Sequence, residues 1–84
     1  MKAFADTSGL FAALVRNDAK HASAREVLAR LLEARCELHV TSYVLLEMES
    51  LLQNRVGLDA ARQFDHVYRP VLRVHWIEET LILP

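Results

Sequence analysis

Residues 4–15 read F-A-D-T-S-G-L-F-A-A-L-V, and this stretch decides how the chain begins. A short apolar lead stops at Asp6, two hydroxyl residues and a glycine follow, and an apolar run then continues to position 15. The pattern predicts a buried strand that ends at Asp6 and passes directly into a helix, with Thr7 or Ser8 as the capping residue. Ligands collect at the carboxyl ends of strands in open α/β sheets. Asp6 is therefore either a functional carboxylate or a plain capping acid stabilised by about 0.3–1 kcal/mol, and this stretch favours neither.

The composition indicates one small, packed domain. The chain has 84 residues, of which 52% are apolar and only two are glycine and two proline, so a disordered segment is excluded. A net charge of −1 excludes a general attraction to nucleic acid. The single cysteine, Cys36, excludes an internal disulfide and a cysteine-rich zinc site. The longest apolar run, residues 10–15, is far shorter than the ~20 residues that span a bilayer, and no secretory signal pattern is visible. We expect a cytoplasmic protein without membrane contact.

The strand-to-helix arrangement of the opening stretch occurs again in the middle of the chain. A predicted helix over residues 19–35 leads to a strand candidate at residues 38–41. Thr41 and Ser42 then provide a second pair of hydroxyl caps before a helix over residues 43–56, which Gly57 ends.

The last part of the chain adds a fourth helix and a third strand. The helix begins near Asp59 and should end before Pro70, because the residue preceding a proline is disfavoured in the α region. Residues 71–77 are rich in β-branched and aromatic side chains and predict a strand, with a turn at residues 78–80. The resulting β-αα-β-αα-β order predicts an α/β fold with a parallel sheet and right-handed crossovers.

Two acids can meet in such a fold. Asp6 ends the first strand, and Glu47 lies in the first turns of the helix that follows the second strand. Parallel neighbouring strands would open both positions onto one edge of the sheet. Carboxylates about 4 Å apart repel each other by ~4 kcal/mol at an effective dielectric constant of 20, so a proton or a cation should lie between them. With oxygen ligands and no nearby cysteine or histidine, Mg²⁺ or Mn²⁺ is the expected cation.

The alternative is that Asp6 only caps a helix and Glu47 is simply exposed. The apolar neighbours of Glu47, at positions 45, 46 and 48, are unusual for a freely solvated residue and favour the paired-acid hypothesis. Glu49 should point elsewhere, because two residues turn a helix by about 200°, and we interpret it as a solvated surface charge. Arg55, near the end of the same helix, is too far along it to assist the site directly. His39 is interpreted as a polar strand residue and not as a ligand, because no second histidine stands at a useful spacing.

Four segments together carry a resemblance to a known family. They are F-A-D-T-S-G-L-F-A-A-L, D-A-K-H-A-S-A, H-V-T-S-Y-V-L-L-E-M-E-S-L-L and R-V-G-L-D-A-A, which begin at positions 4, 18, 39 and 55. In this order they resemble a PIN domain, and among PIN domains the VapC-type toxins of bacterial toxin–antitoxin pairs. The resemblance extends over nearly the whole chain.

This resemblance implies a three-layer α/β/α sandwich with a parallel sheet, and the activity of an endoribonuclease dependent on Mg²⁺ or Mn²⁺. In such enzymes a cluster of acids holds the metal, which activates water for attack on a phosphodiester. Asp6 matches the first acid of the family pattern and Glu47 the second, which gives both a metal-binding and catalytic role. Ser8 matches a hydroxyl often found near the first acid, so a supporting role at the cofactor is implied. RNA as substrate and an antitoxin protein as partner follow from the same resemblance.

The chain departs from the family pattern in its later part. Further acids of the family lie beyond the third strand, and no residue here matches them. We therefore expect residues 1–84 to form a single PIN-like domain whose C-terminal part is missing, with a weakly held metal and weak or no activity. The alternative function is a degenerate PIN remnant that binds a protein partner or self-associates. The first strand is central in the family, so the edge at residues 2–6 would be unpaired here and would favour a homo-oligomer.

Overall fold

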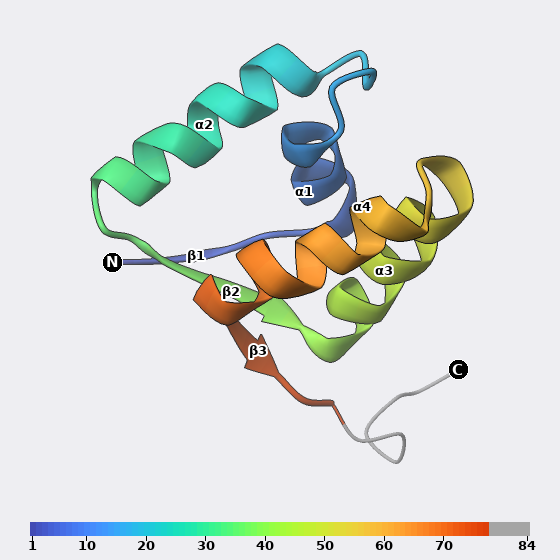
Figure 1. Ribbon diagram of the computed structural model, residues 1–84. Helices are drawn as coiled ribbons and strands as arrows, with labels where there is room; N and C mark the ends of the chain where they lie inside the picture. Colours follow the sequence, from blue (N-terminus) through green and yellow to red (C-terminus); the bar gives the residue numbers. More distant parts are fainter. Residues whose placement is uncertain (78–84) are drawn as a thin grey trace, which may run out of the picture.

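A computed structural model describes residues 1–77 (Figure 1). The predicted α/β class and the β-αα-β-αα-β order are confirmed. The turn predicted at residues 78–80 lies outside the described residues. In chain order the elements are β1 (Lys2–Phe4), α1 (Thr7–Leu14), α2 (His21–Glu33), β2 (Glu37–Thr41), α3 (Ser42–Arg55), α4 (Leu58–Gln63), the π-helical turn η1 (Phe64–Tyr68), the 3-10 turn η2 (Arg69–Val71) and β3 (Leu72–His75).

The sheet has three strands in the order β1-β2-β3, and both pairings are parallel. Phe4 lies opposite His39 in the first pairing, and His39 lies opposite Arg73 in the second. Both crossovers run in the same direction across the sheet, so right-handed connections bring the helices to the same face. In Figure 1 the helices accordingly lie on one side of the three strands.

The core lies between the sheet and these helices. Alternate strand residues point into it, because successive side chains of a strand face opposite sides. The buried members of this cluster are Leu38, Val40 and Leu72 from the strands and Leu10, Phe11, Leu45, Met48, Leu52 and Phe64 from the helical segments.

The other face of the sheet carries the alternate set of side chains. Phe4 lies on this face and is 69% exposed. No helix within residues 1–77 covers this face (Figure 1). The described residues thus supply the sheet and one helical layer of the expected three-layer sandwich.

Local capping differs from the prediction at three places. Asp6 itself caps α1, whereas Thr7 and Ser8 were the expected caps. The second helix begins at His21, two residues later than the predicted start at residue 19, and it has no side-chain cap. The helical path also continues past the expected end at Pro70, because Pro70 lies at the start of η2, where a missing N–H has no intrahelical partner to lose. The end of α3 agrees with the prediction, since Gly57 has a φ of 146° and donates its N–H to the Leu52 carbonyl.

Among the described residues, no helix has the length and apolar character that crossing a bilayer requires.

Substitution of two adjacent leucines of α3 tests which face of this helix is buried in the core. Leu45 is 2% exposed and Leu46 is 58% exposed. We expect Leu45→Ala to lower the free energy of unfolding by about 2–5 kcal/mol, because it leaves a cavity in the core. Leu46→Ala removes the same atoms from the surface and should change it by no more than about 0.5 kcal/mol. Urea denaturation of both variants checks this, and equal losses would contradict the assignment of the buried face of α3.

Candidate functional site

Asp6 lies between the end of β1 and the start of α1. Its Oδ1 accepts a hydrogen bond of 2.8 Å from the Gly9 N–H and one of 3.5 Å from the Ser8 hydroxyl. Its other carboxylate oxygen has no hydrogen-bond partner within residues 1–77. The capping interpretation of Asp6 is therefore correct, and it leaves one oxygen available to a ligand. Ser8 contacts the carboxylate directly, which is the position expected of a supporting hydroxyl.

Gly9 permits the close contact between its own N–H and the Asp6 carboxylate. A Cβ atom built at Gly9 would stand 2.9 Å from Asp6 Oδ1, closer than such atoms normally approach. Any larger residue at this position would have to displace the carboxylate or break the cap. The D-T-S-G sequence therefore fixes the direction of the Asp6 side chain, a role for Gly9 that the pattern alone did not reveal.

Glu47 approaches the same place from α3. Thr41 caps this helix by accepting the Val44 N–H at 3.2 Å, so the helix begins immediately at the end of β2. Glu47 is exposed, and it lines a hollow of about 480 Å³ together with Asp6. The parallel pairing of β1 and β2 thus brings the two acids to one hollow, as the sequence predicts. Its other lining residues are Thr7, Ser8, Phe11, Asp18, Leu51 and Arg55.

Among residues 1–77, one cation lines the hollow, and the sequence interpretation placed it too far away. Arg55 lines it alongside Asp6 and Glu47. Its guanidinium lies 5.8 Å from the centre of the Phe11 ring, a cation–π distance. Within residues 1–77 it forms no ion pair with any carboxylate. The exclusion of Arg55 was wrong because it considered only the distance between the two residues along the axis of α3. Glu47 and Arg55 share one helix face at an i, i+8 spacing, and a long side chain leans toward the helix N-terminus.

The acids of the hollow offer an incomplete set of metal ligands. The described residues contain no group of three or more histidine, cysteine, aspartate or glutamate side chains placed to hold a metal ion. Asp6 and Glu47 supply carboxylate oxygens, which suit Mg²⁺ or Mn²⁺. These two residues fit part of a metal shell, with water left to supply the remaining ligands.

Glu49 lies outside the hollow, as expected from its position on α3. It is half-buried and not fully solvated, which differs from the prediction. Burial, together with the neighbouring Asp65, raises the pKa of Glu49 above its ordinary value. Glu49 thus interacts with the η1 segment and provides a useful comparison for Glu47 on the same helix.

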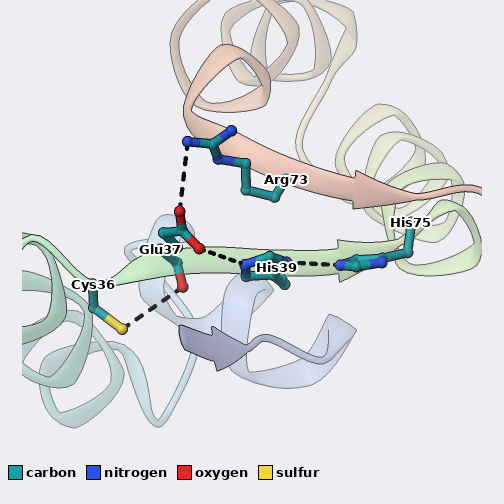
Figure 2. Close-up of polar contacts among 5 residues, drawn as sticks. All are labelled: Cys36, Glu37, His39, Arg73 and His75. Carbon is teal, nitrogen blue, oxygen red and sulfur yellow. Dashed lines mark hydrogen bonds and ion pairs between the residues drawn. The ribbon is translucent and has the colours of Figure 1, made fainter. Parts of the chain in front are cut away.

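A second polar cluster crosses the uncovered face of the sheet (Figure 2). His39 of β2 lies between Glu37 and His75, with His39 Nδ1 2.7 Å from His75 Nε2 and His39 Nε2 3.2 Å from Glu37 Oε1. Arg73 of β3 places its guanidinium 3.7 Å from the other oxygen of Glu37. The Phe4 ring packs against both imidazoles, at centroid distances of 5.3 and 5.5 Å.

This cluster shows His39 as a hydrogen-bonded polar strand residue, as the sequence indicates, and corrects only the premise that no second histidine lies near it. A second histidine does stand beside it, brought there by the pairing of β2 with β3 and not by spacing along the chain. An ionised Glu37 only accepts, so His39 Nε2–H donates to it, and a second hydrogen bond joins His39 Nδ1 to His75 Nε2. Both ring nitrogens of His39 are thus occupied. The hydrogen bond from His39 lowers the pKa of Glu37 below its ordinary value of 4.5, and the charge of Arg73 adds to this effect.

The lowered pKa of Glu37 gives the chain a predictable response to acid. Because the folded-state pKa lies below the unfolded one, the interaction stabilises the fold above about pH 4.5 and is lost as the pH falls through the lowered value. We expect Glu37→Gln to be less stable than the unaltered chain near neutral pH, and this difference to shrink as the pH falls below about 4.5. Urea midpoints measured from neutral pH into the acid range follow the difference. A difference that stays constant with pH would show that the Glu37 charge is not its source.

Comparison with known proteins places this geometry in a wider context. No family model matches the sequence, and no curated protein matches it. Among solved structures, the chain is similar to VapC20 of Mycobacterium tuberculosis, described as a Sarcin-Ricin loop cleaving toxin, with a TM-score of 0.73 and 28% sequence identity. The likeness covers 96% of this chain and 60% of that one. The chain thus spans about three fifths of the length of the solved structure it matches.

Proposed function

We propose that this chain, which has the VapC-type PIN fold, carries the first half of the active site of a metal-dependent endoribonuclease toxin. The observation that supports this proposal is the meeting of Asp6 and Glu47 at one hollow beside the carboxyl ends of β1 and β2. In this proposal residues 1–84 belong to one PIN-like domain, and they span about three fifths of the length of the matched toxin. The acid set is incomplete, so the activity of this chain by itself is weak.

Asp6 and Glu47 are the proposed metal ligands and catalytic residues. The two carboxylates hold the ion, and Ser8 steadies the Asp6 carboxylate through the hydroxyl contact at Oδ1. A bound Mg²⁺ or Mn²⁺ would lower the pKa of a coordinated water and offset charge on the phosphodiester. The cap from the Gly9 N–H holds Asp6 in one orientation before the metal arrives, which reduces the ordering that binding requires.

RNA is the proposed substrate and an antitoxin protein the proposed partner, both by analogy with the matched toxin fold. The cytoplasm is the proposed compartment. The single cysteine, which is buried and free, is consistent with a reducing environment.

Conservative substitutions of the two acids test the metal site. Asn remains a good N-cap, so Asp6→Asn should change stability by a few tenths of a kcal/mol while removing the charge. We expect Asp6→Asn and Glu47→Gln each to weaken Mn²⁺ binding about tenfold or more, and to abolish Mn²⁺-dependent cleavage of single-stranded RNA. Titration followed by Mn²⁺ electron paramagnetic resonance measures binding separately from activity.

Glu49→Gln is the matched control on the same helix. It removes an identical charge two residues away and outside the hollow, so Mn²⁺ binding and cleavage should stay at the level of the unaltered chain. If Asp6→Asn binds Mn²⁺ and cleaves RNA as well as Glu49→Gln, the proposed function is wrong.

The β1 edge favours a second candidate function, self-association. Ala5 N–H donates to His39 and Glu37 N–H donates to Met1, so odd-numbered residues of β1 bond to β2. The backbone groups of Lys2 and Phe4 then face outward, away from the sheet. An open edge of this kind accepts a strand from another molecule. Phe4 also exposes 69% of its surface beside this edge.

A charge at Phe4 tests this candidate. If β1 pairs with a second copy, Phe4→Lys should raise the dimer dissociation constant about tenfold or more, because it places like charges across the interface. Val67→Lys is the control, since Val67 is 53% exposed and lies on η1 away from the edge. Sedimentation equilibrium provides the measurement. A monodisperse monomer of the unaltered chain at the highest attainable concentration would exclude self-association.

A further inference from the structure

We infer that Arg55 binds a backbone phosphate of the RNA next to the cleaved bond, an inference that rests on the proposed function. The hollow that contains Asp6 and Glu47 does not end at Arg55. A second hollow of about 610 Å³ begins there, between the ends of α1 and α3 and the α4–η1 segment. Phe11, Asp18 and Arg55 line both hollows, so the two meet at the Arg55 side chain.

The second hollow has walls that suit a nucleotide. Tyr68 contributes a half-buried aromatic ring, and the buried Phe64 ring packs against it with 6.3 Å between centroids. Arg16, Asn17 and Gln63 contribute polar groups that can bond to phosphate, sugar or base edges. A single RNA strand that crosses the metal ligands would continue past Arg55 into this space.

The charges of the first hollow explain why Arg55 is needed there. Asp6, Asp18 and Glu47 make its lining acidic, and a polyanion would be repelled from it. A metal ion offsets part of that charge at the cleaved phosphate. Arg55 is the cation among the lining residues, and it lies on the side toward the second hollow, where the next phosphate would pass.

The side chain of Arg55 is positioned and its donors remain available. The guanidinium carbon of Arg55 lies over the ring of the buried Phe11, 5.8 Å from its centre. A cation–π contact does not use the N–H groups as hydrogen-bond donors, so they stay able to form a bidentate contact. No carboxylate of residues 1–77 is ion-paired with them. These properties are those of a phosphate-binding arginine.

RNA binding without metal separates this inference from the metal site. Fluorescence anisotropy of a labelled single-stranded RNA in EDTA, at several salt concentrations, reports the contact without cleavage. We expect Arg55→Gln to weaken binding about tenfold at low salt. The slope of log K against log salt should fall by about 0.7, the value for one phosphate contact on a single strand. Arg55→Lys keeps the charge and should restore the salt slope while binding less tightly than the unaltered chain.

Arg25→Gln is the matched control, because Arg25 is an exposed arginine of α2 that lines neither hollow. Arg25→Gln should leave the slope of log K against log salt unchanged. If Arg55 had only a structural role, Arg55→Gln would leave this slope unchanged as well. Equal slopes for Arg55→Gln and Arg25→Gln would overturn the inference, as would a failure of the unaltered chain to bind RNA. If cleavage and Mn²⁺ binding prove independent of Asp6 while the slope still depends on Arg55, the proposed function fails and the phosphate contact stands.

Discussion

The parallel pairing of β1 with β2 is the constraint on which the rest of the structure depends. It sets Phe4 opposite His39 and makes both strands end at the same edge of the sheet. Each strand passes at once into a capped helix, with Asp6 as the cap of α1 and Thr41 as the cap of α3. The two helix starts therefore lie side by side. An antiparallel pairing of the same strands would place the acids at opposite ends of the sheet, and the hollow between them would not exist.

Much of this arrangement is predictable because it depends on local patterns. Hydroxyl or acidic caps, apolar periodicity and Gly57 locate the helices to within a few residues, and alternation of strands with helices implies parallel pairing. Asp6 shows the limit of that reasoning. Capping and ligand binding looked like competing interpretations, yet a carboxylate has two oxygens, and the cap uses only Oδ1. The two roles are compatible and can support each other.

The residues that the sequence did not reveal depend on tertiary placement. His75 joins His39 because β2 and β3 pair in a specific register, and a shift of one residue would turn one of them to the opposite face. The sequence pattern excludes Arg55 from the site, because about 12 Å of helix separates it from Glu47. Backbone distance is a poor guide for a residue with a long side chain. The Phe11 ring, supplied by a different helix, determines where the guanidinium lies.

The electrostatics of the hollow explain why so few of its groups are paired. A fold selected only for stability would join Arg55 to a neighbouring carboxylate, but exposed ion pairs contribute only about 0–1 kcal/mol, so leaving the charges apart costs little. The separation keeps each group available to a ligand of opposite charge, a cation at Asp6 and Glu47 and a phosphate at Arg55. Under the proposed function, metal and RNA would then reinforce each other, because a bound cation would reduce the repulsion that the RNA meets, and the cleaved phosphate would supply further oxygen ligands to the cation. The two carboxylates would not have to fill the oxygen shell of the ion by themselves.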